Sequence, residues 1–306
     1  MFKEKFREGI ISAKQFSRED IEYVLEKARE MIQIKNSDLL KGKILATLFF
    51  EPSTRTRLSF ESAMIRLGGN VIGFQSGEVS SVKKGENLAD TIRTVQNYCD
   101  CIVIRHDLEG AAVLASRFSN IPIINAGSGS GEHPTQALLD LFTIKEECGT
   151  LDGLNIGIMG DLKYGRTVHS LSILLSNFDV NIYFISPKEL TLRTRDIEFL
   201  RARQLKYKEI TKYRNILNIL DVLYITRIQK ERFADLEEYE KVKDFYVFRK
   251  EDVELTKDTF KIMHPLPRVN EISPDVDNYS DKAIYFKQTL YGLHLRKAIL
   301  AELIKD

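Results

Sequence analysis

The most informative segment of the chain places three hydroxyl side chains and two arginines directly after an apolar run. Residues 53–57 read STRTR, and an amphipathic helix is expected to begin among them. The free backbone N–H groups and the positive dipole end at a helix start favour an anion, and hydroxyls add further donors. An arginine adds a planar fork that matches phosphate oxygens. The segment therefore predicts a phosphate site.

The simpler interpretation of this segment is an N-capped helix that carries surface arginines. A single Ser or Thr would suffice as the cap. Arg55 and Arg57, however, crowd into one first turn, where positive charge opposes the helix dipole unless an anion is present. We therefore favour the anion site.

Two glycine-containing loops carry further polar side chains. Residues 127–134 (GSGSGEHP) end in His133 and in a proline that suits the first position of a helix. A histidine beside a proline is by default more often structural, although this composition lets the backbone approach a ligand. Residues 160–166 (GDLKYGR) superficially resemble a dinucleotide fingerprint, but the GxGxxG register is absent. We expect this loop instead to deliver Arg166 to the carboxyl end of a sheet, where open α/β sheets bind ligands.

The elements that must position these loops alternate regularly along the chain. Short β-branched runs predict buried strands at 44–50, 101–105, 121–125, 155–159, 181–185, 222–226 and 261–264. Longer amphipathic segments predict helices at 17–34, 54–67, 110–118, 135–147, 167–177 and 291–304. This alternation predicts an α/β protein with parallel sheets covered on both faces. The last helix has no strand after it, and the pattern leaves open which half it packs on.

Length and composition limit the class of protein. The 306 residues suffice for two domains of about 150 residues each. Lysine and arginine total 45 against 44 acidic residues, so neither nucleic acid nor a membrane surface is expected as a partner. The start of the sequence is charged, without the apolar core of a signal peptide, and no apolar run is long enough to span a membrane. The three cysteines include no CxxC pair, so we expect no zinc site and a cytoplasmic protein.

The segment 53–57 resembles the carbamoyl-phosphate signature of the aspartate and ornithine carbamoyltransferases. Further matches follow in family order over nearly the whole chain: 83–86 (KKGE), 105–106 (RH), 133–136 (HPTQ), 160–166 (GDLKYGR), 226–229 (TRIQ) and 264–268 (HPLPR). The resemblance implies two doubly wound parallel-sheet domains, with the C-terminal helix returning to the first domain.

The second half of the chain must identify the acceptor, because the two kinds of carbamoyltransferase share the first half of the site. An ornithine enzyme binds an ammonium side chain and resembles a His-Cys-Leu-Pro motif late in the chain, whereas residues 264–267 read HPLP here. Arg166, Arg227 and Gln229 offer two cations and an amide for a dicarboxylate. Arginine suits planar carboxylates. The sequence therefore favours L-aspartate over L-ornithine.

The resemblance implies a role for each motif residue. A carbamoyl-phosphate-binding domain is expected at 1–133 plus 287–306 and an aspartate-binding domain at 134–286. The residues implied for carbamoyl phosphate are Ser53, Thr54, Arg55, Thr56, Ser80, Arg105, His133 and Gln136, with Leu266 and Pro267 through the backbone. Those implied for aspartate are Lys84, Arg166, Arg227 and Gln229. Arg55, Thr56, Lys84, Arg105 and His133 are the expected catalytic residues, with Thr56, Arg105 and His133 on the carbonyl oxygen.

Ser80 and Lys84 lie in a polar segment without periodicity, which by itself would indicate a solvated surface loop. The resemblance implies instead that both reach into the active site of a neighbouring subunit of a homotrimer. Spacing to Lys84 favours Ser80 over Ser81 for this role. Relatives often join a separate zinc-bearing regulatory chain, and the sequence leaves open whether this chain does.

The resemblance implies transfer of a carbamoyl group from carbamoyl phosphate to the amine of L-aspartate, an early committed step of de novo pyrimidine biosynthesis. Carbamoyl phosphate is already activated, so no covalent nucleophile, metal or organic cofactor is expected. Catalysis would rest on positioning and on oxyanion stabilisation. The alternative is a non-catalytic scaffold or anion-binding regulator. Loss of Arg55, Lys84, Arg105 or His133 would have favoured it, and all four are present.

Overall fold

A computed structural model describes residues 2–76, 85–230, 233 and 235–305. The chain divides into two compact units, Met1–Phe142 with Thr289–Asp306 (unit 1) and Thr143–Gln288 (unit 2). Each unit contains a five-stranded parallel sheet with flanking helices, so the predicted α/β class is confirmed. The unit boundaries fall inside two long helices, whereas the sequence placed the domain boundaries at 133/134 and 286/287.

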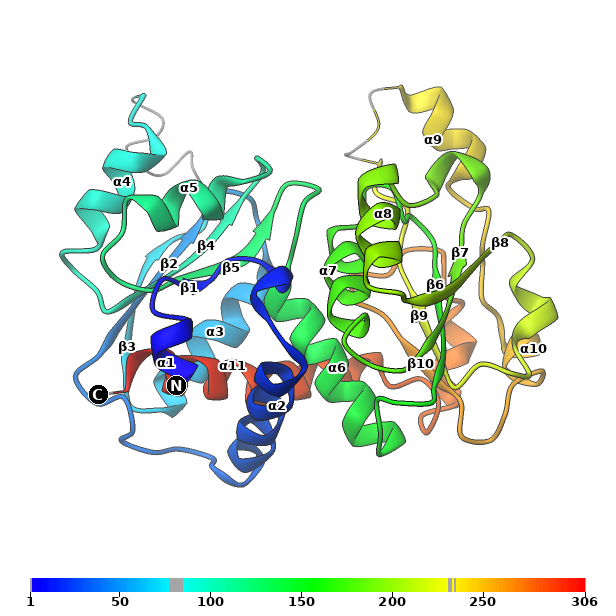
Figure 1. Ribbon diagram of the computed structural model, residues 1–306, viewed down its shortest axis with the longest axis horizontal. Helices are drawn as coiled ribbons and strands as arrows, with labels where there is room; N and C mark the ends of the chain where they lie inside the picture. Colours follow the sequence, from blue (N-terminus) through cyan, green and yellow to red (C-terminus); the bar gives the residue numbers. More distant parts are fainter. Residues whose placement is uncertain (1, 77–84, 231–232, 234, 306) are drawn as a thin grey trace. The chain divides into compact units, whose positions relative to one another are not determined.

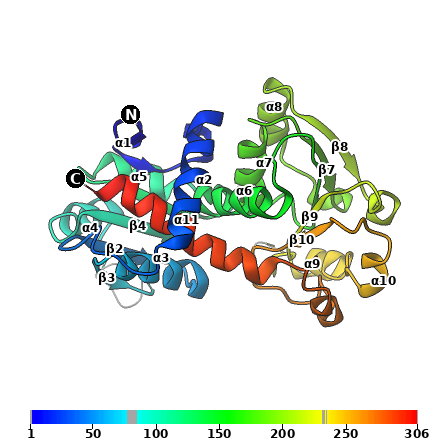
Figure 2. The ribbon, with the colours of Figure 1, turned by 90° about the horizontal axis from the view of Figure 1, so that it is seen from below.

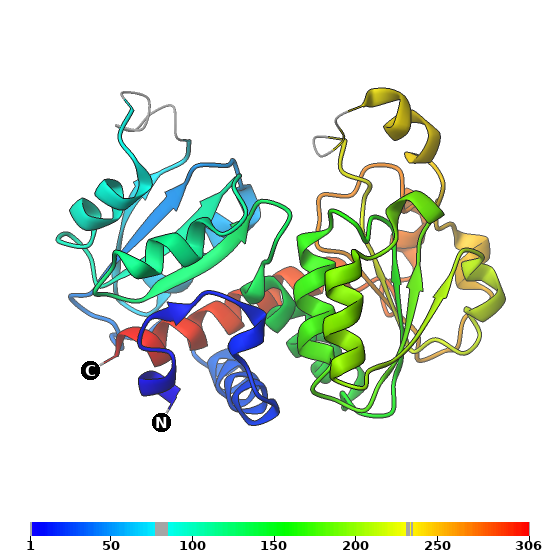
Figure 3. The ribbon, with the colours of Figure 1, turned by 45° about the horizontal axis from the view of Figure 1, so that its top comes forward.

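Unit 1 is built on sheet A, whose strand order is β1-β5-β4-β2-β3. Its strands are β1 (Gly9–Ile10), β2 (Ile44–Phe49), β3 (Asn70–Phe74), β4 (Cys101–His106) and β5 (Ile123–Ser128). Its helices are α1 (Phe2–Lys5), α2 (Arg18–Gln33), α3 (Thr54–Arg66), α4 (Leu88–Val95) and α5 (Ala111–Arg117), followed by the start of α6 (Pro134–Cys148). Helices α4 and α5 cover one face of the sheet (Figure 3), where alternate residues of β2 and β4 meet their apolar side chains.

Unit 2 is built on sheet B, whose strand order is β10-β9-β6-β7-β8. Its strands are β6 (Asn155–Met159), β7 (Asn181–Ile185), β8 (Lys206–Ile210), β9 (Val222–Ile225) and β10 (Lys261–Met263). Its helices are α7 (Arg166–Leu175), α8 (Thr194–Ala202), α9 (Leu236–Val242) and α10 (Lys250–Val253). Helices α7 and α8 contact each other. An apolar cluster that includes Leu217, Phe248 and Phe260 packs with residues of β6, β9 and β10.

The last helix, α11 (Tyr285–Ile304), returns to unit 1 as predicted. It runs beside α2 and α3 (Figure 2). Arg296 of α11 donates to the Ser59 hydroxyl of α3 at 2.8 Å, and Lys297 donates to the Met31 carbonyl of α2 at 2.6 Å. The helix begins six residues earlier than the predicted 291–304. No helix in the described part of the chain is long and apolar enough to cross a membrane.

Three strands were missed from the sequence, namely β1, β3 and β8. Each lies at the edge of its sheet, and the residues of β3 and β8 are mostly exposed. An edge strand that is open to solvent has no continuous apolar run to reveal it. The seven predicted strands exist, with ends that differ by up to three residues, most at β5, which continues through Gly127 to Ser128.

Candidate active site

Both sheets reverse the direction of their strand order at one point. In sheet A the chain leaves β2 for β3 on one side and then places β4 on the other side of β2. In sheet B it leaves β6 for β7 and β8 and then places β9 on the other side of β6. The loops that follow two such strands diverge and leave a crevice at the carboxyl edge, which is where open α/β sheets bind ligands. The predicted site residues lie on these loops.

In unit 1 the loop after β2 leads directly into the first turn of α3. Ser53 is the N-cap residue in an extended conformation, and its hydroxyl makes no capping hydrogen bond to the described helix. Thr54, Arg55 and Thr56 form the first turn; Thr56 is buried, whereas the other two are exposed. The first turn has no acidic residue. The hydroxyls and helix N–H groups therefore form a donor-rich end suited to an anion.

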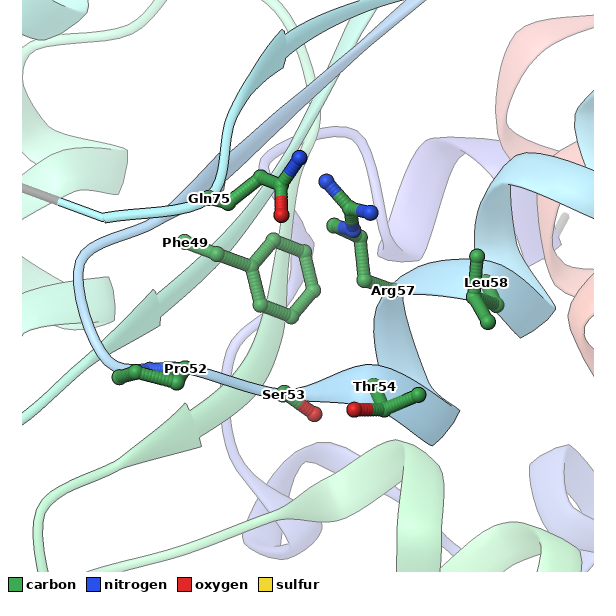
Figure 4. Close-up of a pocket in the computed structure, with 7 residues that line it drawn as sticks. All are labelled: Phe49, Pro52, Ser53, Thr54, Arg57, Leu58 and Gln75. Atoms are coloured by element: carbon green, nitrogen blue, oxygen red, sulfur yellow. The ribbon is translucent and has the colours of Figure 1, made fainter. Parts of the chain in front are cut away.

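A hollow of about 140 Å³ adjoins this helix start (Figure 4). It is lined by Phe49, Pro52, Ser53, Thr54, Arg57, Leu58 and Gln75. Arg57 extends beside the Phe49 ring toward Gln75, and the Ser53 and Thr54 hydroxyls lie next to each other at the helix start (Figure 4). Arg57 also lies 3.7 Å from the Glu61 carboxylate one turn along α3. The second arginine of the segment therefore faces this hollow.

Arg105 lies at the carboxyl end of β4, in register with Phe49 of the neighbouring β2. Its Nε donates to the Glu51 carboxylate at 3.0 Å, and both side chains are mostly covered. An ion pair between the end of one strand and the loop after its neighbour holds a long side chain in one orientation. Glu51 therefore fixes Arg105 at the sheet edge beside the start of α3.

His133 follows β5, the neighbour of β4, and caps α6 through its carbonyl oxygen, which accepts from Gln136 N at 3.0 Å. The preceding loop turns tightly: Gly129 has a φ of +51°, and a Cβ there would lie 2.7 Å from Glu109 N. His133 is 3% exposed. The buried Gln136 side chain donates to Asp140 Oδ1 at 2.9 Å. Three adjacent strands thus bring residues 53–56, Arg105 and His133 to one edge of sheet A.

In unit 2 the loops after β6 and β9 carry the predicted acceptor residues. Arg166 is the first residue of α7 and is buried, whereas Arg227 and Gln229 follow β9 and are half-buried. The two loops approach closely, because a Cβ at Gly160 would lie only 2.2 Å from the Thr226 carbonyl oxygen. Two cations and an amide therefore meet at the carboxyl edge of sheet B.

Asp161 is a buried residue that connects these two loops. It is fully buried, and its backbone N donates to Thr226 Oγ1 at 3.2 Å while its carboxylate accepts from Tyr164 N at 2.9 Å. Burial raises the pKa of Asp161 to about 6, and the backbone N–H groups of Tyr164, Gln229 and Lys163 oppose that rise. Asp161 is thus bonded to both loops, through its carboxylate to Tyr164 and through its backbone N to Thr226. The sequence prediction missed this role, although Asp161 belongs to the 160–166 motif.

A second side chain, on α7, also holds the 160–166 loop. His169 of α7 is buried, and its Nε2 lies 2.9 Å from the Leu162 carbonyl oxygen. Its Nδ1 lies 2.9 Å from Arg193 Nη2, and Arg193 Nε donates to Asp196 at 2.7 Å. Because arginine can only donate, Nδ1 accepts and Nε2 carries the proton toward Leu162. Arg193 and Asp196 therefore fix the tautomer with which His169 holds this loop.

The loop after β10 carries Leu266 and Pro267, joined by a cis peptide bond. The Leu266 N–H donates to His264 Nδ1 at 2.7 Å, and His264 Nε2 lies 2.7 Å from Glu271 Oε1. Burial alone would raise the pKa of Glu271, but its hydrogen bond with His264 lowers it. Since the Leu266 N–H is used and Pro267 has none, the backbone of these two residues can offer carbonyl oxygens but no donor to a ligand.

Among the predicted site residues, Ser80 and Lys84 lie outside the described residues. Sheet A gathers Ser53, Thr54, Arg55, Thr56, Arg105, His133 and Gln136, and sheet B gathers Arg166, Arg227, Gln229, Leu266 and Pro267. The supporting residues Glu51, Asp140, Asp161, His169 and Arg193 were not assigned such roles from the sequence. Their partners are distant in the chain, so no local pattern reveals them.

Two family models match the chain. The carbamoyl-P binding domain of aspartate/ornithine carbamoyltransferases matches residues 9–146, and the Asp/Orn binding domain of the same family matches residues 152–303. The aspartate carbamoyltransferase catalytic subunit of Thermococcus kodakarensis is 57% identical over 295 residues, which cover 95% of either chain. That of Methanocaldococcus jannaschii is 56% identical over 302 residues, 97% of this chain and 98% of the relative.

Solved structures agree with these relatives. The catalytic subunit of M. jannaschii aspartate transcarbamoylase superposes with a TM-score of 0.89 at 55% identity, covering 98% of both chains. Aspartate transcarbamoylase from Trypanosoma cruzi, in complex with N-(phosphonacetyl)-L-aspartic acid, superposes with a TM-score of 0.93 at 41% identity, covering 99% of this chain and 97% of that one. The two family models together match most of the chain, and relatives more than half identical cover nearly all of it; the chain therefore belongs to the aspartate/ornithine carbamoyltransferase family.

Proposed function

We propose that this enzyme transfers the carbamoyl group of carbamoyl phosphate to the amine of L-aspartate, giving N-carbamoyl-L-aspartate and phosphate. This is the committed early step of de novo pyrimidine biosynthesis. The observation that carries the proposal is the pairing of an anion site at the switch point of sheet A with two arginines at that of sheet B. Relatives are named for this reaction, and a structural neighbour binds both carbamoyl phosphate and aspartate.

The donor half of the proposed site binds carbamoyl phosphate. Ser53, Thr54, Arg55 and Thr56 hold the phosphate at the α3 start, which supplies N–H donors and a favourable dipole. Thr56, Arg105 and His133 donate to the carbonyl oxygen. Gln136 and the carbonyl oxygens of Leu266 and Pro267 orient the carbamoyl amide, whose N–H groups need acceptors.

The acceptor half binds two carboxylates with Arg166, Arg227, Gln229 and the Lys84 ammonium. A guanidinium forms two parallel bonds with a carboxylate, which fixes orientation as well as charge. An ornithine side chain would instead bring an ammonium toward these cations and be repelled. The acceptor half therefore selects a dicarboxylate.

The reaction needs no covalent enzyme intermediate. The neutral amine of aspartate attacks the carbamoyl carbon, and the carbonyl electron pair moves onto oxygen to give a tetrahedral intermediate. When the pair returns, the C–O bond to phosphate breaks, and phosphate leaves with that bond's electrons and takes up the proton that the amine loses. Donors placed on the developing oxyanion typically contribute about 10²–10³ each in rate. Holding both substrates in one geometry contributes up to about 7–11 kcal/mol.

Phosphate release from carbamoyl phosphate, measured with L-aspartate or with L-ornithine as acceptor, tests the proposal. We expect release that depends on L-aspartate, yields carbamoyl-aspartate in equal amount and is absent with L-ornithine. Release with L-ornithine alone would reassign the acceptor. No release with either amino acid, from protein that still binds phosphate, would favour the anion-binding regulator.

The enzyme is further proposed to act as a homotrimer in which Ser80 and Lys84 complete the site of a neighbour. Exposed apolar residues of unit 1 support such an assembly: Leu58 and Ile65 lie seven residues apart on α3, and Ile72 lies on the edge strand β3. An exposed apolar surface beside an open sheet edge favours a covering partner. A cytoplasmic location and the binding of a separate regulatory chain stay predictions.

Reassembly of mixed trimers tests the shared site. Arg55→Ala and Lys84→Ala chains are each expected to be inactive alone. After dissociation and mixing in equal amounts, about one quarter of the sites would combine an intact Arg55 from one chain with an intact Lys84 from the next, as in a closed ring of heterologous contacts.

A matched control mixes Arg55→Ala with Arg227→Ala, two residues expected to serve the same chain's site, and should restore nothing. Native electrophoresis verifies that subunits have exchanged. Equal activity in both mixtures, or none in either, contradicts a site shared through Lys84.

A further inference from the structure

The C-terminal helix α11 carries a buried arginine that contacts two of the helices on which the donor site is built. Arg296 is 4% exposed, although arginine is rarely covered to this extent. Its Nη1 donates to Ser59 Oγ of α3 at 2.8 Å, and its guanidinium lies over the Phe60 ring of α3, 5.0 Å from the ring centroid. The arginine thus contacts, by a hydrogen bond and by a ring, the helix whose first turn is Thr54-Arg55-Thr56.

The same guanidinium feels the charge of a buried carboxylate on α6, the neighbouring helix whose Leu139 lies beside Gly292 of α11. Asp140 is fully buried, and its charge favours the protonated form of Arg296. Burial lowers the pKa of Arg296 to about 10, so the guanidinium stays charged at neutral pH. Asp140 Oδ1 in turn accepts from Gln136 Nε2 at 2.9 Å. The guanidinium of α11 thus acts on the charge of a carboxylate that is itself hydrogen-bonded to a side chain in the first turn of α6.

A glycine one turn before Arg296 leaves space for its guanidinium. Gly292 occupies the middle of α11, where glycine is unfavourable relative to alanine. A Cβ at this position would lie 3.0 Å from Arg296 Nη1 and 3.1 Å from Leu139 Cδ2. A buried charge is costly unless it is paired or hydrogen-bonded. Simple packing of α11 would be achieved better by an apolar residue.

From these contacts we infer that Arg296 is a positioning residue for carbamoyl phosphate, holding the first turns of α3 and α6 at a fixed spacing through Ser59 and through the Asp140–Gln136 pair. The inference rests on the proposed function, because Gln136 and the α3 start are its proposed donor-site groups. Arg296 touches no substrate itself. Its replacement removes no residue of the site, but the spacing between the starts of α3 and α6 becomes less fixed. Affinity for carbamoyl phosphate therefore falls more than affinity for aspartate.

The test compares two adjacent buried cations of α11. Arg296→Met should raise KM for carbamoyl phosphate about 5- to 20-fold and weaken competition by inorganic phosphate equally, as loss of hydrogen bonds to a charged group does. Lys297→Met is the control, because Lys297 is also buried but donates to the carbonyl oxygens of Met31 and Ile34, at the end of α2. It should lower the melting temperature without changing either constant.

Two milder variants keep the inference testable if Arg296→Met does not fold. Arg296→Lys retains a cation beside Asp140 and should restore part of the affinity, and Ser59→Ala removes only the α3 contact and should weaken carbamoyl-phosphate binding about two- to fivefold. Folded variants at Arg296 and Ser59 that match the wild-type KM would overturn the inference. A wild-type enzyme that neither binds carbamoyl phosphate nor uses aspartate would instead refute the proposed function.

Discussion

Sheets A and B both carry polar site groups at a reversal of strand order, but different contacts hold those groups in place. Each has a central strand, a reversal of strand order beside it and polar loops at the carboxyl edge of the reversal. In unit 1 the site groups lie largely on first turns of α3 and α6 and are braced by charged side-chain pairs such as Arg105–Glu51. In unit 2 Arg227, Gln229 and Leu266 lie on loops, and buried side chains hold the backbone of such loops at Tyr164 and Leu266.

The difference follows from where each site group stands. A helix start already orders its backbone, so side-chain pairs suffice to aim an arginine or a glutamine. A loop has no such order, and its backbone must be held by buried acceptors and donors. Substitutions in unit 1 should therefore affect the donor substrate through one contact at a time. Substitutions in unit 2 should affect the acceptor by releasing whole loops.

The largest effect is expected for Arg55→Ala in unit 1. Loss of the phosphate cation at the α3 start should lower kcat at least about 10²–10³-fold, by analogy with the loss of one transition-state donor. The exposed position should leave the circular dichroism spectrum unchanged. Arg66→Ala, at the other end of α3 and also exposed, is the control with wild-type turnover. Turnover within a few-fold of wild type in Arg55→Ala would remove this residue from the site.

Arg227→Ala in unit 2 should weaken binding of the acceptor rather than of the donor. A charge-assisted bond is worth about 1.5–3 kcal/mol, so KM for aspartate should rise about 10- to 150-fold while binding of carbamoyl phosphate hardly changes. Titration of succinate as a dicarboxylate analogue should show the same loss. An aspartate constant equal to that of wild type would mean that Arg227 does not contact the acceptor.

The pH dependence of aspartate binding should reveal the tether at Asp161. Burial raises the pKa of this carboxyl to about 6, so it gains a proton as the pH falls through that value. The protonated carboxyl is a poorer acceptor for the backbone N–H groups of Tyr164 and Gln229, and aspartate affinity should fall below about pH 6. Asp161→Asn should show weak affinity at every pH between 5 and 8. An unchanged pH profile in this variant would exclude the tether.

Arg193→Met should give the smallest effect of the series. Without its donor at Nδ1, His169 loses the tautomer that holds the Leu162 carbonyl, and KM for aspartate should rise about 2- to 12-fold for a bond worth about 0.5–1.5 kcal/mol. Arg201→Met is the control, because Arg201 lies on the same helix but donates to Tyr207. Equal constants in the two variants would show that α8 has no influence on the acceptor site.

The sequence pattern was sufficient to predict the fold class and the strands whose residues are buried on both faces, and the family resemblance added the return of the last helix. It was insufficient for β3 and β8, because an exposed edge strand lacks the apolar run that marks a buried one. Motif residues such as Arg55 and His133 could be proposed because they stand in dense local patterns. Arg296 and Asp140 could not, because 156 positions separate them and each looks unremarkable within its own helix. Only the folded chain brings the two charges together.

The return of α11 to unit 1 has a consequence for how the protein is made. Unit 1 begins at the first residues of the chain, yet its packing requires Thr289–Asp306, which are translated after all of unit 2. At about 5–20 residues per second, the donor unit waits several seconds or more after its own first 142 residues have been synthesised. Unit 2 (Thr143–Gln288) is contiguous and can complete its core first. The unit that is begun first in synthesis is therefore the last to have all of its residues.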